Sequence, residues 1–155
     1  LGRLLAAIPR RVAISALILD VQGYDLSVLR SAPPAELARV PLVIGEVTLN
    51  GTREYTDAPP NDLDDWRPAM ARRGFGLVSL DVNGCEGQEG AHGRVREGDA
   101  VWMSRRARAK RARGPGRWWS WFCADDGSML VNGEPAGLGG RVAELNRFCA
   151  ETYDS

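Results

Sequence analysis

The sequence has few of the residues on which many folds and catalytic sites depend. Its 155 residues include three cysteines, Cys85, Cys123 and Cys149, and one histidine, His92. The cysteines are too few and too scattered for a disulfide framework and form no C-x-x-C pair, which favours a reducing, cytoplasmic compartment. His92 has no Cys or His partner at ligand spacing, so we expect a solvent-exposed loop histidine and no metal site. No serine lies in a G-x-S-x-G motif, so the sequence does not indicate the nucleophilic serine of a hydrolase.

Long apolar runs and a net charge are also lacking. No stretch approaches the roughly 20 apolar residues that cross a bilayer, so we expect no membrane span. Twenty basic and twenty acidic side chains cancel. Locally the balance differs: residues 54–65 carry five acidic and no basic side chains, and residues 105–117 carry seven basic and no acidic ones. The chain begins with Leu1 and has no signal-peptide pattern. We expect it to begin inside a longer reading frame.

Over the first 104 residues, apolar runs alternate with helical patterns. This order predicts an α/β sheet whose last two strands pair as an antiparallel hairpin across a long loop. The predicted strands span residues 13–19, 41–49, 75–82 and 99–104. The predicted helices span residues 3–8 (closed by Pro9), 24–31, 35–39 and 62–73, with polar loops at 50–61 and 83–98.

The segment from Ala16 to Asp25 carries the strongest functional signal. An apolar run ends in Asp20, and Gly23 follows three residues later, before a helical pattern begins. An apolar run without alternation fits a strand buried on both faces of a parallel sheet. Ligands bind beyond the carboxyl ends of the strands in open α/β sheets. We therefore expect Asp20 at a functional site.

These residues resemble a known enzyme family. The run from Leu17 to Gly23, followed by apolar helix positions, is similar to the strand–Asp-Val-Glu/Gln-Gly–helix signature of FkbM-type methyltransferases. Further similarity lies in the strand 43–47, which carries Glu46, in Tyr55 of the next loop, and in the last strand at 99–102. The resemblance covers roughly residues 1–104. It implies a Rossmann-like sheet, S-adenosylmethionine (SAM) as cofactor, and O-methylation of a small-molecule or sugar hydroxyl.

The chain departs from that family in its glycines. The glycines between residues 84 and 98 precede a strand rather than open a helix, and those at 137–140 follow the resembling region. The resemblance therefore implies the C-terminal, acceptor-side half of a methyltransferase domain at residues 1–104, without the half that holds the adenosine. We expect the 155 residues alone to bind SAM very weakly and to be inactive.

Within this resemblance, Asp20 is the candidate catalytic residue. An aspartate carboxylate is a weak base at neutral pH, so orienting the acceptor hydroxyl fits better than deprotonating it. The alternative is that Asp20 caps a helix or a turn. Gln22 would bind cofactor or acceptor, or else face solvent. Gly23 would permit the tight turn from strand to helix.

Two further candidates follow the second strand. Glu46 would face the same crevice as Asp20 and contact the acceptor, or would form a salt bridge with Arg53 or another base. Tyr55 would line the acceptor pocket, or would lie on the surface. The loops that would select the acceptor carry no diagnostic pattern, and the sequence does not indicate an oligomeric state.

The remainder of the chain differs in character. Residues 105–117 form a basic linker, and residues 118–155 form a Trp-rich extension with Trp118, Trp119 and Trp121 and a predicted terminal helix at 141–151. Bases beside aromatics can bind single-stranded nucleic acid, and bases alone can dock on an anionic membrane. The plainer interpretation is a solvated linker followed by tryptophans packed on the sheet. The alternative function is thus a non-catalytic α/β module whose extension binds nucleic acid or a protein partner.

Overall fold

The computed structural model describes residues 1–49, 51, 57–82, 97–111, 130–131 and 134–135. The chain order alternates short helices with strands before ending in a strand hairpin, a helix and two minimal strands. The elements are α1 (Gly2–Ala7), β1 (Leu17–Leu19), α2 (Asp25–Arg30), α3 (Pro34–Leu37), β2 (Leu42–Thr48), α4 (Leu63–Arg72), β3 (Phe75–Val82), β4 (Glu97–Ser104), α5 (Arg105–Arg111), β5 (Leu130–Val131) and β6 (Glu134–Pro135).

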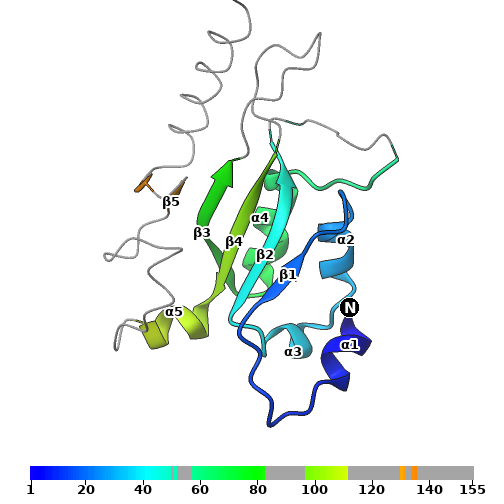
Figure 1. The fold of residues 1–155 in the computed structure, drawn as a ribbon, viewed down its shortest axis with the longest axis vertical. Helices are drawn as coiled ribbons and strands as arrows, with labels where there is room; N and C mark the ends of the chain where they lie inside the picture. The colour runs from blue at the N-terminus through cyan, green and yellow to red at the C-terminus, as the bar shows by residue number, and fades with distance from the viewer. Residues whose placement is uncertain (50, 52–56, 83–96, 112–129, 132–133, 136–155) are drawn as a thin grey trace, which may run out of the picture.

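The strands form one mixed sheet in the order β1-β2-β4-β3-β5-β6, and Figure 1 shows β1, β2, β4 and β3 side by side. β1 and β2 are parallel, and β4 lies antiparallel between β2 and β3. The α/β class and the antiparallel pairing of β3 with β4 are therefore confirmed. In β3 the register shifts between Leu77 and Ser79, where the strand bulges.

Several predicted boundaries were wrong in informative ways. β1 is confined to Leu17–Leu19, because only these residues pair with β2, although the apolar run begins at Ala13. β4 begins two residues earlier than predicted, at Glu97. Residues 105–111 of the predicted linker are helical: Arg, Ala and Lys favour a helix, and the Ser104 side chain accepts the Ala107 N–H at 3.2 Å. The predicted terminal helix at 141–151 lies outside the described residues, as do Trp118, Trp119 and Trp121 of the extension.

The two faces of the sheet are packed differently. On the helix face, Val43, Val47 and Trp102 belong to a large core cluster with residues of α1, α2, α3 and α4. The other face, which we call the second face, carries Leu42, Val101 and Met103. These side chains form a smaller cluster, to which Ala107 of α5 also belongs. Ile18, which pairs with Ile44 next to this cluster, is 69% exposed.

Two tryptophans form the centre of the helix face. Trp66 of α4 stacks on Trp102 of β4, with ring centroids 6.0 Å apart and an interplanar angle of 9°. Trp66 also lies over Gly45 of β2, where an added Cβ would come within 2.7 Å of the indole Cη2. The glycine thus allows α4 to approach β2 closely, and this contact fixes α4 beside the carboxyl end of β2.

Candidate functional site

Four carboxylates lie in a row across the sheet at the carboxyl ends of β1 and β2. Glu46 pairs in register with Asp99, and Asp99 pairs with Asp81. Asp20 directly follows Leu19, the partner of Gly45, and so comes beside Glu46. Cross-strand partners share a face, and alternate residues along a strand share a face. All four side chains therefore belong to the second face, which is the face without α1–α4.

A tight turn fixes Asp20 at the end of this row. Gln22 and Gly23 adopt left-handed backbone conformations, with φ of 50° and 82°, and reverse the chain between β1 and α2. The Gln22 amide Nε2 donates a hydrogen bond to Asp20 Oδ1 at 2.8 Å. The helix-cap alternative for Asp20 is wrong, because Tyr24 is the N-cap of α2 and no side chain caps it. Asp20 and Gln22 are exposed, and Gly23 is buried.

Of the two other predicted site residues, Glu46 is among the described residues and Tyr55 is not. Glu46 is half-buried and lies next to Asp20 in the row, as the sequence predicted. Tyr55, together with Arg53 as the proposed salt-bridge partner of Glu46, lies outside the described residues. The row also contains Asp81 and Asp99, which sequence reasoning missed, because their alignment depends on the register of β3 against β4.

Asn61, a third residue that sequence reasoning missed, links three elements around the row. Its side chain is buried; Oδ1 accepts the Leu26 backbone N–H at 3.1 Å and the Trp66 indole N–H at 3.0 Å. Its Nδ2 donates to the Glu46 carbonyl at 3.0 Å. Asn61 thereby ties α2 and α4 to the end of β2. The available signal was weak: an asparagine just before the Asp62 N-cap of α4.

Asp25, the first residue of α2, is a buried carboxyl under the β1–α2 turn. It is 0% exposed, and neither carboxylate oxygen has a hydrogen-bond partner among the described residues. Burial raises the pKa of Asp25, and the charge of Asp20 adds to that shift, whereas nearby backbone amides of Asp25 and Val21 oppose it. Burial also raises the pKa of Asp99, followed by the charges of Asp81 and Asp20. Within the row, burial and the neighbouring carboxylates thus favour the protonated form of Asp99.

A pH-dependent stability difference is expected for Asp25→Asn. Since the folded chain holds the Asp25 proton more tightly than the unfolded chain, folding is favoured below the ordinary aspartate pKa of about 3.9 and loses stability as pH rises toward the raised pKa. The variant lacks this loss. Urea unfolding at a series of pH values should therefore show Asp25→Asn gaining on the wild type as pH rises. The exposed Asp64→Asn is the control, and an equal gain there would refute the assignment.

The described residues also bear on metal binding and on membrane insertion. No group of three or more His, Cys, Asp or Glu side chains in this part of the chain is placed to hold a metal ion, the acidic row included. Among the helices described, none is long and apolar enough to span a bilayer. In comparisons with known proteins, no family model, no curated protein and no solved structure matches this chain.

Proposed function

We propose that this chain is the acceptor-side part of a SAM-dependent methyltransferase similar to the FkbM type, acting on a hydroxyl of a small molecule or sugar. The observation that carries the proposal is the hydrogen bond from Gln22 to Asp20 at the tip of β1, beside Glu46 on the same face of the sheet. Both residues were singled out by the sequence resemblance. The pairing of the last two strands as an antiparallel hairpin also supports it.

The residues at the strand tips suit an acceptor hydroxyl. Gln22 occupies Asp20 Oδ1 and holds the carboxylate in one orientation, which leaves Oδ2 to accept the hydroxyl proton in a hydrogen bond. Such positioning of the nucleophilic oxygen is a contribution that enzymes make to transfer reactions. Glu46, half-buried next to Asp20, supplies a second acceptor for a neighbouring hydroxyl of the same substrate.

The described residues fit the acceptor better than the cofactor. In the enzyme SAM supplies the methyl group, and its adenosine needs a glycine-rich turn that opens a helix. The strand–turn–helix unit in the described part, β1 to α2, has a single glycine, Gly23. The proposal therefore gives the role of holding the adenosine to residues outside the described part of the chain.

Very weak SAM binding by the 155-residue chain is the expected result. Without an adenosine site, isothermal titration should give no saturable heat at micromolar SAM, because carboxylates alone offer the sulfonium only a solvent-screened attraction. A dissociation constant in the micromolar range would contradict the proposed division of the domain. Sequencing the transcript upstream of Leu1 provides the companion test. The proposal expects an in-frame strand, glycine-rich turn, helix and second strand ending in Asp or Glu.

A second candidate is a non-catalytic module that binds nucleic acid or a protein partner. It is favoured by α5, where Arg105, Arg106 and Arg108 are exposed and the first turn carries no acidic residue. Retardation of single-stranded nucleic acid that falls steeply between two salt concentrations would support this candidate over the methyltransferase.

A further inference from the structure

A concave region lies at the opposite end of the sheet from Asp20. It is a cavity of about 420 Å³, formed where the segment between α1 and β1, the entry to β2, and the β4–α5 junction meet. The last two meet directly, since the Ser104 N–H donates to the Pro41 carbonyl at 2.9 Å. Small-molecule sites commonly enclose about 300–1,000 Å³, so this cavity has room for a compact ligand.

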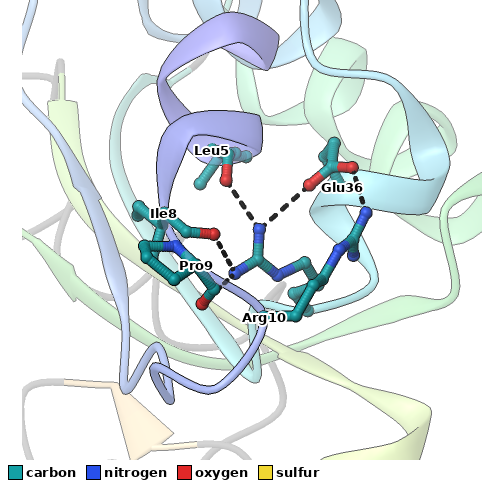
Figure 2. Close-up of polar contacts among 6 residues, drawn as sticks. Leu5, Ile8, Pro9, Arg10 and Glu36 are labelled. Carbon is teal, nitrogen blue, oxygen red and sulfur yellow. Dashed lines mark hydrogen bonds and ion pairs between the residues drawn. The ribbon is translucent and has the colours of Figure 1, made fainter.

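The lining of this cavity has one sign of charge. Arg10, Arg39 and Arg106 contribute to it, and no acidic residue does. The carboxylate of Glu36 compensates part of this charge and is occupied on both oxygens: Oε1 pairs with Arg10 at 2.6 Å and Oε2 with Arg39 at 3.1 Å (Figure 2). Three guanidinium groups against one engaged carboxylate leave the cavity positive.

Arg39 holds one wall of the cavity in place through several hydrogen bonds. Its guanidinium donates to the backbone carbonyls of Leu5, Ile8 and Pro9, in addition to Glu36 (Figure 2). The Arg39 and Glu36 side chains are each 13% exposed. These bonds join the end of α1 to α3 and hold one wall of the cavity in place, so that a ligand would meet a preformed surface.

Arg10 contacts Glu36 through Nη2, so its guanidinium keeps further N–H groups for a ligand, and two other donors lie beside it. Arg106 is exposed and forms no ion pair within the described part of the chain. The Ser104 hydroxyl oxygen accepts the Ala107 N–H, which leaves the hydroxyl proton to donate. Between the donors, the lining is apolar, with Val12, Ile14, Val40, Pro41 and Ala107.

We propose that this cavity binds a small organic anion: a phosphate or carboxylate head on Arg106, Arg10 and the Ser104 hydroxyl, and a compact apolar body against the accessible side chains of Val12 and Ile14. Guanidinium groups pair with these heads through charge-assisted hydrogen bonds. The site is independent of the proposed methyl transfer, because Asp20 and Glu46 lie at the other ends of the strands.

The test uses phenyl phosphate, benzoate, inorganic phosphate and phenol as probes. Binding of each probe to the 155-residue chain is measured by the shifts of its amide NMR signals. Phenyl phosphate or benzoate should bind saturably and shift the amides of Val12, Ile14 and residues 104–107. Either should bind about tenfold more tightly than inorganic phosphate, which lacks the apolar body, or phenol, which lacks the anionic head. Comparing the two organic anions shows which head the site takes.

Variants decide whether the cavity or the general basic character binds the probe. Arg106→Gln and Arg10→Gln should each weaken binding about tenfold, the value of one charged hydrogen bond. Arg105→Gln is the matched control: it removes the same charge from the adjacent exposed position of α5, which does not line the cavity. Equal weakening by Arg105→Gln, or no saturable shift with either organic anion, would overturn the proposal.

Discussion

Asn61→Ala is expected to lower the free energy of unfolding by about 3 kcal/mol or more. The substitution leaves three groups without their partner: the Leu26 N–H, the Trp66 indole N–H and the Glu46 carbonyl. Each buried polar group that loses its hydrogen bond costs about 1–3 kcal/mol. Urea denaturation followed by circular dichroism measures the loss, which should come with an unchanged m value.

A neighbouring substitution provides the comparison. Asp62→Ala removes the side-chain cap of α4, whose Oδ1 accepts the Asp64 N–H at 3.0 Å. Removal of such a cap costs about 1 kcal/mol. If Asn61→Ala cost no more than Asp62→Ala, Asn61 would not be the link between α2, α4 and the end of β2.

Trp66→Leu is expected to cost about 3 kcal/mol, and it should also abolish the requirement for glycine at position 45. The change removes a fully buried indole, its stacking on Trp102 and its hydrogen bond to Asn61. In the wild type, Gly45→Ala should cost about 2 kcal/mol, because its Cβ would lie 2.7 Å from an indole that Trp102 prevents from retreating. In the Trp66→Leu background the same change should cost about zero.

The double-mutant cycle for Gly45 and Trp66 isolates this contact. Gly76→Ala is the matched control in the same sheet: its Cβ would meet the nearest atom, Nη2 of Arg108, at an ordinary 3.5 Å. We expect a change within about 0.5 kcal/mol there. Additive effects of Gly45→Ala and Trp66→Leu would show that the close approach of α4 to β2 does not depend on the glycine.

Sequence patterns located most of the sheet because its strands carry their own signals. β2 and β3 are apolar runs bounded by turn residues, and their boundaries agree with the prediction to within one residue at each end. The run that contains β1 looked longer, since Ala13 and Ile14 are apolar too. Strand pairing, however, requires a neighbour, and hydrophobicity does not show where that neighbour ends.

Only two of the four carboxylates in the row could be predicted from the sequence, again because strand pairing is not encoded locally. Asp20 and Glu46 could be found because each comes near the end of an apolar run. Asp99 and Asp81 join them through the register of two strands, which no local pattern encodes. Asp25 lies in the first turn of the predicted helix 24–31, a place where acidic side chains are usually exposed and favourable, so the sequence does not indicate its burial. Its burial depends on how α2 packs against β2.

Methyl transfer by the polypeptide translated from the complete reading frame is the most direct test of the role given to Asp20. With labelled SAM and a panel of hydroxyl acceptors, the wild type should form a methyl ether. Asp20→Ala should reduce kcat about a hundredfold, because the acceptor hydroxyl loses the carboxylate that orients it, with SAM affinity unchanged. Asp64→Ala, at a surface position whose side chain is 92% exposed, should match the wild type. Equal rates for Asp20→Ala and Asp64→Ala, or no transfer by the wild type, would contradict the proposed function.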